Sequence, residues 1–252
     1  MMKVATVQFA PGFKQKSENL MKLAKLVIEA ARNGAKLVVL PELCTTGYSF
    51  MSEEEARPFA ESPNWLDDLD SIRSDTAVGV FSKLARKLDV HIIFGFVGLD
   101  LGSNKIHNSQ LYISPEGDYA YYHKLNPWGN DYLWAAKGRS NPPVVHVEGR
   151  RVGLLVCRDV RDKVNKDWTN LYSPGDADVV CLSANWGKGG FPSGSWMDFV
   201  EENKTALVIS NRYGLEEHND FGGGGICIIE KSGKVHCTGL KWNEDCIVYG
   251  DI

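Results

Sequence analysis

Residues 152–161 read Val-Gly-Leu-Leu-Val-Cys-Arg-Asp-Val-Arg, an apolar run that becomes charged directly after a cysteine. Short apolar runs bounded by charge are typical of buried β-strands. Cys157 then stands at the tip of a strand, where a fold can bring several loops together. The position suits a nucleophile, although this segment alone fits an ordinary core cysteine equally well.

Two other apolar strands end in the groups that a nucleophilic thiol needs. Glu42 follows the apolar segment 37–40 across one proline, and Lys124 follows the tyrosine-rich segment 118–122 across one histidine. Taken singly, Glu42 fits a turn or helix cap and Lys124 fits a solvated charge. Together with Cys157 they make a general base, an oxyanion stabiliser and a nucleophile at three strand ends.

With these residues the chain resembles the carbon–nitrogen hydrolase (nitrilase) superfamily, whose Glu-Lys-Cys triad has this order. The matching segments keep the family's order along nearly the whole chain: residues 4–9, Pro41-Glu42 with Thr46-Gly47-Tyr48, His123-Lys124 with Gly138, residues 152–161, Ala184-Asn185-Trp186, Glu202-Asn203 and Asn211-Arg212-Tyr213-Gly214. Each motif is weak alone, but the ordered set is specific. The resemblance identifies residues 1–252 as one carbon-nitrogen hydrolase domain.

The resemblance implies an α/β fold of the nitrilase type, an α-β-β-α sandwich. It also implies hydrolysis of a small linear amide or N-carbamoyl compound through a cysteine thioester, with release of ammonia or an amine. Glu42 is then the base for the Cys157 thiol, and Lys124 with the backbone N–H of Arg158 stabilises the oxyanion. We expect no cofactor and no metal.

The chain departs from the family pattern near its lysine motif. Many relatives carry a second glutamate seven positions before the glycine that corresponds to Gly138, and Asp131 stands there in this chain. We expect Asp131 to lie near Lys124 as a further catalytic residue, the alternative being a solvated loop aspartate. Five residues are candidates for substrate binding, although core packing is an alternative for the aromatic ones: Tyr48, Trp128, Arg158, Asn185 and Trp186.

The residues after the cysteine bear on the substrate. Arg158-Asp159 replaces the Trp-Glu that the superfamily's nitrilases usually have, so amide hydrolysis is expected over nitrile hydrolysis. Arg158 is also a candidate for binding a substrate carboxylate, whereas Arg161 is expected to hold its loop by pairing with an acid. Two competing interpretations are a catalytically idle nitrilase-like binding or assembly protein and a Cys-His protease, for which the histidines carry no signature.

Composition narrows the class of protein further. A chain of 252 residues with 43% hydrophobic residues can bury one large core. The net charge of −4 argues against a nucleic-acid or anionic-membrane surface. The first residues do not read as a signal peptide, so we expect a cytoplasmic protein. The six cysteines show no Cys-x-x-Cys pair and are expected to be free thiols, with Cys181 and Cys227 in the core.

Periodicity predicts alternating helices and strands. Apolar residues recur at helical spacing over 20–31, with Ser17 as a candidate N-cap and Gly34 as a stop, and again over 77–88. Residues 90–97 read as a buried strand. Further strands linked by turns follow. Apolar residues on the outer helices and the strand-like C-terminus suggest that chains pair through helices near the cysteine and exchange terminal segments, as the resemblance to the family's dimers implies. We therefore expect a homodimer or larger homo-oligomer.

Overall fold

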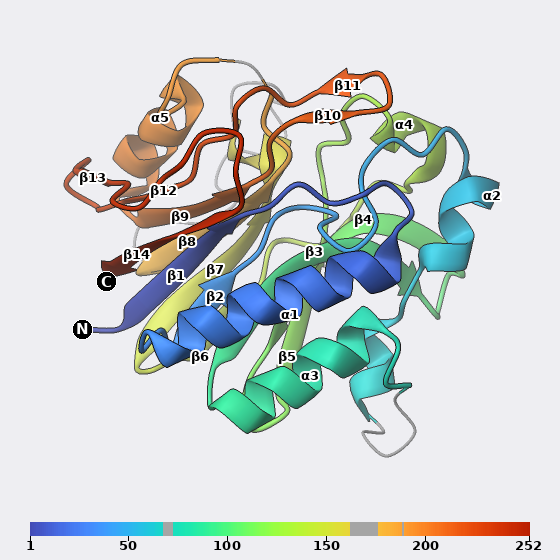
Figure 1. Cartoon of the computed structure of the whole chain (residues 1–252), viewed down its shortest axis with the longest axis horizontal. Coiled ribbons are helices and arrows are strands. Elements are labelled where there is room, and N and C mark those ends of the chain that lie inside the picture. Colours follow the sequence, from blue (N-terminus) through green and yellow to red (C-terminus); the bar gives the residue numbers. More distant parts are fainter. Residues whose placement is uncertain (68–72, 162–175, 188) are drawn as a thin grey trace.

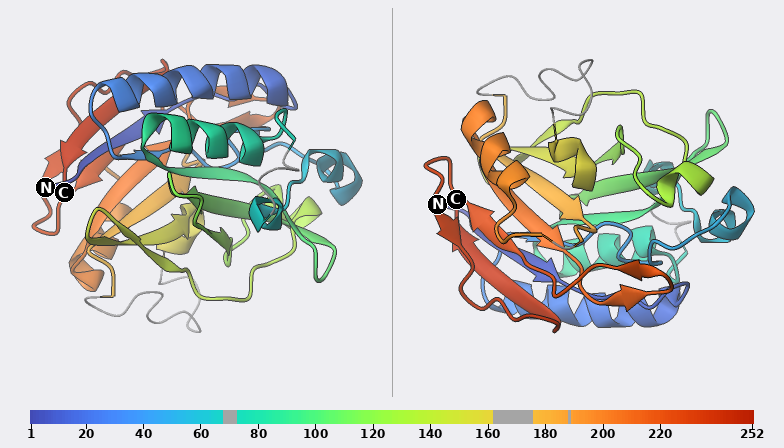
Figure 2. Two further views of the ribbon diagram at one scale, coloured as in Figure 1. Left: turned by 90° about the horizontal axis from the view of Figure 1, so that it is seen from below. Right: turned by 90° about the horizontal axis from the view of Figure 1, so that it is seen from above.

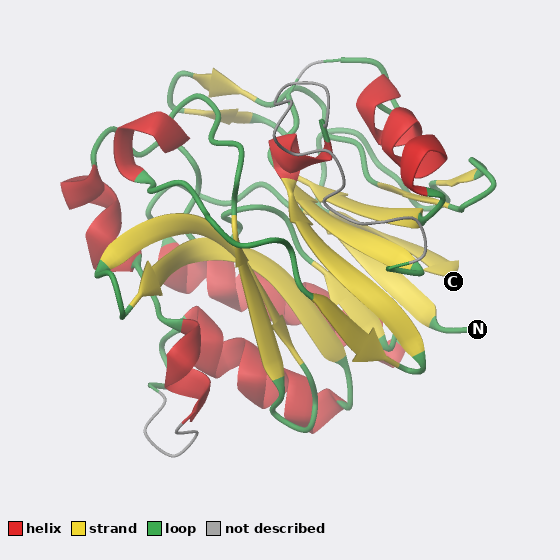
Figure 3. Cartoon of the chain, turned by 180° about the vertical axis from the view of Figure 1, so that it is seen from behind, coloured by secondary structure: helices red, strands yellow, loops and turns green. Residues whose placement is uncertain are grey.

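Two groups of strands stack face to face in the computed structural model, which describes residues 1–67, 73–161, 176–187 and 189–252 (Figures 1 and 3). The first group contains β1 (Lys3–Gln8), β2 (Leu37–Val39), β3 (His91–Asp100), β4 (Lys105–Ile113), β5 (Tyr119–His123) and β14 (Cys246–Asp251). The second contains β6 (Val144–Val147), β7 (Arg150–Val156), β8 (Val179–Ala184), β9 (Ala206–Asn211), β12 (Cys227–Ile229) and β13 (Val235–His236).

The two groups are continuous only at one point. The strand order is β5-β4-β3-β2-β1-β9-β8-β7-β6, and the β1–β9 step consists of the single pair Gln8–Asn211. Beyond this seam the sheet folds back on itself, so β4 contacts β7 and β3 contacts β8. Apolar side chains from both groups, such as Ile93 and Leu154, fill the space between them. The nearly closed sheet thus forms the two inner layers of the expected sandwich.

Helices cover the outer faces. α1 (Lys16–Arg32) and α3 (Ala77–Leu88) pack side by side on the first group of strands (Figure 2), and α5 (Gly194–Asn203) packs on the second. The shorter elements are α2 (Glu53–Ala56), α4 (Asp131–Trp134), the 3-10 turns η1 (Arg57–Phe59), η2 (Pro63–Asp67) and η3 (Cys157–Val160), and the hairpin β10 (Leu215–Glu216) with β11 (Asn219–Asp220). The expected α-β-β-α arrangement is confirmed.

Two details differ from the sequence predictions. The first helix begins at Lys16 with Gln15 as its N-cap, so the assignment of Ser17 as the cap is wrong. The C-terminal strand β14 pairs antiparallel with β1 of its own chain, and the two termini lie side by side (Figure 1). The C-terminal strand therefore has its pairing partner within its own chain. We had expected this segment to be exchanged between subunits. Within the described ranges, no helix is both long and apolar enough to cross a membrane.

Candidate active site

The segments that carry the predicted triad follow strands that run in one direction. β2, β7 and β8 belong to parallel ladders, and β5 shares the direction of β3 because two successive antiparallel pairings separate them. The segments that follow β2, β5, β7 and β8 therefore meet, as the carboxyl ends of parallel strands do in other α/β proteins. These segments carry Glu42, Lys124, Cys157 and Asn185.

Glu42 is fully buried in a tight turn that presses against β3. The next residue, Leu43, has a left-handed backbone with a φ of 47°, which turns the chain sharply after the carboxylate. A Cβ atom at Gly95 of β3 would lie 2.5 Å from both Glu42 Cα and Leu43 N. Only glycine leaves room for this crossing, so Gly95 allows Glu42 to reach its position.

Lys124 lies between two buried carboxylates. Its Nζ atom is 2.6 Å from Glu42 Oε1 and 2.7 Å from Asp131 Oδ2. Asn108 Nδ2 donates to the same two residues, at 2.7 Å to Glu42 Oε1 and 2.9 Å to Asp131 Oδ1. Lys124 is only 2% exposed, so it is not a solvated charge, and Glu42 binds Lys124 instead of capping a helix. Asp131 lies beside Lys124, as expected.

The two carboxylates decide the charge of Lys124. Burial alone lowers the pKa of an amine, but Asp131 and Glu42 act in the opposite direction and hold the pKa of Lys124 well above its usual value. Asp131 is also fully buried and accepts a hydrogen bond of 3.0 Å from Trp128 N. The alternative of a solvated loop aspartate is therefore wrong, and Lys124 is a fixed ammonium.

The backbone around Lys124 is fixed by the glycine of the lysine motif. Gly138 N donates a hydrogen bond of 2.9 Å to Lys124 O. A Cβ atom at Gly138 would lie 2.1 Å from His123 O, closer than non-bonded carbon and oxygen atoms approach. The glycine is therefore required where the segment before residue 140 packs against the end of β5.

Cys157 occupies the first position of η3 with a φ of 45°, a rare conformation for a residue with a side chain. Such backbone strain is often found at functional sites, where surrounding structure maintains it. Burial and the nearby Glu42 raise the pKa of the thiol, while Lys124 opposes them only in part. The thiol is therefore protonated at neutral pH. Among the described residues, the buried Glu42 Oε2 has no hydrogen-bond partner, so it is available as a proton acceptor.

Asp159 anchors η3 to the segment that follows Lys124. Its Oδ2 accepts from Tyr122 Oη at 2.8 Å, and its Oδ1 accepts from Asn126 N at 2.6 Å. Burial raises the pKa of this carboxyl to about 6 despite these hydrogen bonds. The contacts tie the cysteine turn to the lysine turn, and so fix the two groups relative to each other.

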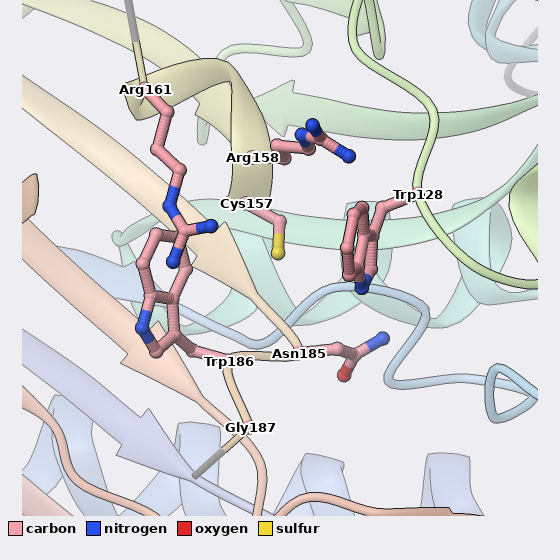
Figure 4. Close-up of a pocket in the computed structure, with 7 residues that line it drawn as sticks. All are labelled: Trp128, Cys157, Arg158, Arg161, Asn185, Trp186 and Gly187. Carbon is pink, nitrogen blue, oxygen red and sulfur yellow. The ribbon is translucent and has the colours of Figure 1, made fainter. Parts of the chain in front are cut away.

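Two stacked pairs of side chains flank the thiol (Figure 4). The guanidinium carbon of Arg158 lies 4.3 Å from the ring centre of Trp128, and that of Arg161 lies 4.4 Å from the ring centre of Trp186. Guanidinium groups stack favourably on indole faces. Arg161 therefore packs on an aromatic ring and contributes to the wall beside Cys157, and the acidic partner that we expected for it stays a prediction.

The space next to Cys157 consists of two adjoining cavities of about 190 and 140 Å³. The first is lined by Trp128, Cys157, Arg158, Arg161, Asn185, Trp186 and Gly187. The second also contacts Cys157 and is lined by Glu42, Tyr48, Lys124 and the β10–β11 hairpin, among others. All five residues predicted to bind substrate thus line one cavity or both. No histidine is among the described lining residues, which does not favour a Cys-His protease.

Tyr48 is held in the wall by a buried ion pair. Glu216 Oε1 accepts hydrogen bonds from Tyr48 N at 2.6 Å and Ser49 N at 2.8 Å, and Glu216 Oε2 accepts one from Arg212 Nη1 at 2.7 Å. The Tyr48 hydroxyl in turn donates to Trp128 O. Tyr48 therefore links the β10–β11 hairpin, through Glu216, to the segment that contains Trp128.

Sequence reasoning missed Asn108 and Glu216. Asn108 belongs to a polar run, residues 107–110, in the middle of strand β4, and all four residues are buried. Buried polar groups require partners, so this run was a usable signal. Glu216 gave no comparable signal, because its exposed neighbour Glu217 is indistinguishable from it in the sequence.

Comparison with known proteins finds nitrilases and amidases as relatives. The family model for carbon-nitrogen hydrolase matches residues 3–252. A nitrilase from Pyrococcus abyssi is 30% identical over 88% of this chain and 79% of its own. A 2-oxoglutaramate amidase from Bacillus subtilis is 27% identical, over 99% of this chain and 90% of its own.

Solved structures show the same fold. An amidase from Nesterenkonia sp. superimposes with a TM-score of 0.81 over 100% of this chain and 90% of its own, at 22% identity. The architecture thus agrees with the match of the family model along the sequence. The chain belongs to the carbon-nitrogen hydrolase (nitrilase) superfamily and groups with its amidase-like members.

Proposed function

We propose that the protein hydrolyses a small linear amide or N-carbamoyl compound through a thioester on Cys157, with residues 1–252 acting as one catalytic domain. One observation carries the proposal. Lys124 is fixed as an ammonium between Glu42 and Asp131, and the remaining oxygen of Glu42 is unpartnered among the described residues. A base, a nucleophile and an oxyanion donor are thereby combined at one point.

The first half of the reaction forms the thioester. Glu42 accepts the thiol proton while the Cys157 sulfur attacks the carbonyl carbon and forms a C–S bond. The resulting oxyanion accepts hydrogen bonds from Lys124 and from the backbone N–H of Arg158, which stands in the first turn of η3, where N–H groups have no partner within the helix. The C–N bond then breaks, and Glu42 returns the proton to the leaving nitrogen as ammonia or an amine.

The second half releases the acid. Water enters where the amine has left, Glu42 accepts its proton, and the hydroxide oxygen attacks the thioester carbon. The same two donors stabilise the second oxyanion. The C–S bond breaks and Cys157 recovers its proton from Glu42. Asp131 takes no proton in this sequence, because its role is to hold Lys124 in place.

A solved relative supports the nucleophile assignment. In one variant of the Nesterenkonia sp. AN1 amidase, the acetamide moiety of fluoroacetamide is added covalently at the active-site cysteine. The small volume of the two cavities beside Cys157 likewise favours a small substrate. Within the proposal, Arg158 is the residue that would favour amides carrying a carboxylate.

The test is turnover of a panel of small amides, N-carbamoyl compounds and nitriles, followed by ammonia release. We expect the Cys157→Ala and Cys157→Ser variants to lose all hydrolysis while keeping the wild-type fold by circular dichroism. Hydrolysis retained by Cys157→Ala would exclude the mechanism, and turnover of nitriles alone would exclude the amide assignment.

Thiol reactivity separates an enzyme from a catalytically idle binding protein. With an active triad, substrate-like alkylating amides should modify Cys157 faster than Cys237, the exposed free cysteine. Mass spectrometry of peptides after brief treatment measures both rates. Faster modification of Cys237 would favour the idle protein.

A further inference from the structure

Two cysteines stand opposite each other on the hairpin formed by β12 and β13 (Figure 1). Cys227 is the first residue of β12, and Cys237 directly follows β13. The two strands pair Ile228 with His236 in antiparallel register, so the next residues along them are the two cysteines. Directly opposite residues of an antiparallel pair carry their side chains on the same face. The register therefore directs both thiols to one side of the hairpin.

The hydrogen-bond pattern of the hairpin places the cysteines at a close pair. Glu230 N donates a hydrogen bond of 2.9 Å to Lys234 O, which marks a hydrogen-bonded pair. Such pairs alternate with non-hydrogen-bonded ones, and counting back from Glu230 along β12 puts Cys227 and Cys237 at a non-hydrogen-bonded pair. The Cα atoms of such pairs are about 4.5 Å apart, within the roughly 4.4–6.8 Å that disulfides span. The backbone thus allows the two sulfurs to meet.

The two thiols differ in their access to solvent. Cys237 is exposed, whereas Cys227 is fully buried and is fixed from its other side by pairing with Ile209 of β9. Burial raises the pKa of Cys227 to about 12, and Cys237 acts in the same direction, as a thiol close by does. An oxidant in solution therefore reaches Cys237 first, while Cys227 stays a protonated thiol beside it.

We propose that Cys227 and Cys237 are a modification site, at which hydrogen peroxide forms a disulfide across the hairpin. The Cys237 sulfur attacks one peroxide oxygen, the O–O bond breaks, and the leaving hydroxide takes the thiol proton as water, which leaves a sulfenic acid. The Cys227 sulfur then attacks the Cys237 sulfur, the S–O bond breaks, and hydroxide leaves as water with the Cys227 proton. The two thiols give up two electrons and two protons, and one peroxide becomes two waters.

The modification is independent of the catalytic thiol. Neither Cys227 nor Cys237 is among the described residues that line the two cavities beside Cys157. The disulfide also has a chemical consequence for Cys237. A sulfenic acid that meets no second thiol is oxidised further to sulfinic and sulfonic acids, whereas a disulfide is reversible by reduction. The buried partner therefore protects the exposed cysteine from irreversible oxidation.

Peptide mapping of the full chain after treatment with hydrogen peroxide tests the proposal. Trypsin cuts after lysine and arginine, which leaves Cys227 in peptide 213–231 and Cys237 in peptide 235–241. Without reduction, we expect one species with the summed mass of the two peptides less two hydrogens. Treatment with dithiothreitol should separate it again. The same linked species should form in Cys157→Ala, where the catalytic thiol cannot react with the peroxide.

Two variants test the separate roles of the thiols. Cys227→Ser removes the thiol that reacts with the sulfenic acid, so the linked species should be lost and Cys237 should become labelled by dimedone, a reagent for sulfenic acids. Cys246→Ser is the matched control, because it removes another buried thiol, on β14, that stands opposite Gln8. The yield of the linked species in this control should equal that of the wild type.

Three results would overturn the proposal. In the first, Cys227 of the peroxide-treated protein is still fully alkylated after unfolding, while Cys237 is found as a sulfinic or sulfonic acid. In the second, peptide 235–241 is linked to peptide 242–252, which carries Cys246. In the third, peptide 235–241 is linked to a second copy of itself, which would show a bridge between chains.

Discussion

Lys124 Nζ lies 2.7 Å from Asp131 Oδ2 in a region that excludes solvent, although Asp131 is one methylene shorter than the glutamate expected from the family pattern. The shorter side chain still reaches Lys124 from the first position of α4. Trp128, which precedes α4, donates its backbone N–H to the same carboxylate oxygen. An aspartate at this position is therefore long enough to hold the Lys124 ammonium.

Replacing Asp131 should weaken catalysis through Lys124. In Asp131→Asn one of the two carboxylates that raise the pKa of Lys124 is lost, so that pKa falls. We expect kcat to fall by about 10²-fold, the scale of a misplaced oxyanion donor. The alkaline limb of the pH–rate profile should also move to lower pH. A profile with an unchanged alkaline limb would show that Asp131 does not act through the charge of Lys124.

Glu42 and Lys124 should be indispensable for different reasons. Glu42→Gln removes the base, and Lys124→Ala removes an oxyanion donor, so each should lower kcat by about 10²-fold or more. Steady-state kinetics on any amide turned over by the wild type measures both effects. Lys83→Ala is a suitable control, because Lys83 is an exposed residue of α3, which covers the outer face of the first group of strands. An unchanged rate in either triad variant would remove that residue from the mechanism.

The Arg212–Glu216 ion pair should be needed for stability as well as for the shape of the site. Both residues are nearly fully buried, so Glu216→Gln leaves an uncompensated guanidinium. Breaking such a pair costs about 3–5 kcal/mol of unfolding free energy. Denaturant unfolding should show this loss, and the exposed neighbour Glu217→Gln should show almost none. Equal stability of the two variants would contradict the prediction.

Acid should destabilise the fold through His123. Burial and the neighbouring His107 lower the pKa of His123 to about 4, below the 6.5 of an unfolded histidine. The unfolded chain therefore takes up a proton first, and stability is lost as the pH falls from 6.5 to 4. By pH 5 the loss of unfolding free energy from this histidine is at most about 2 kcal/mol. Unfolding titrations at pH 7 and 5 should show a smaller difference in His123→Gln than in wild type.

Assembly remains a prediction from the sequence. We expect a homodimer or larger, now without exchange of the C-terminal strand, because β14 already pairs with β1. Pairing would then use the helices near Cys157, such as α5. Sedimentation should show a species heavier than the 28.0 kDa chain at micromolar concentration, and a purely monomeric protein would contradict this.

The sequence by itself determined which residues form the strands and which polar groups end them. Apolar runs before Glu42 and Cys157 predicted buried strands because continuous apolar segments must leave water. The motif order along the chain then predicted the sandwich and its Glu-Lys-Cys set. These inferences depend on local pattern and on resemblance. Both can be read from the order of residues along the chain.

Only the tertiary structure decided how the site is built. Gly95 lies against Glu42 because β3 crosses beneath the glutamate turn, and Glu216 supports Tyr48 from a hairpin far along the chain. Arg161 stacks on Trp186 because the fold brings the segments after β7 and β8 together. Such contacts join residues distant in sequence, and they depend on the stacking and register of two groups of strands. No local pattern encodes that register, because it is fixed by the packing of the whole core.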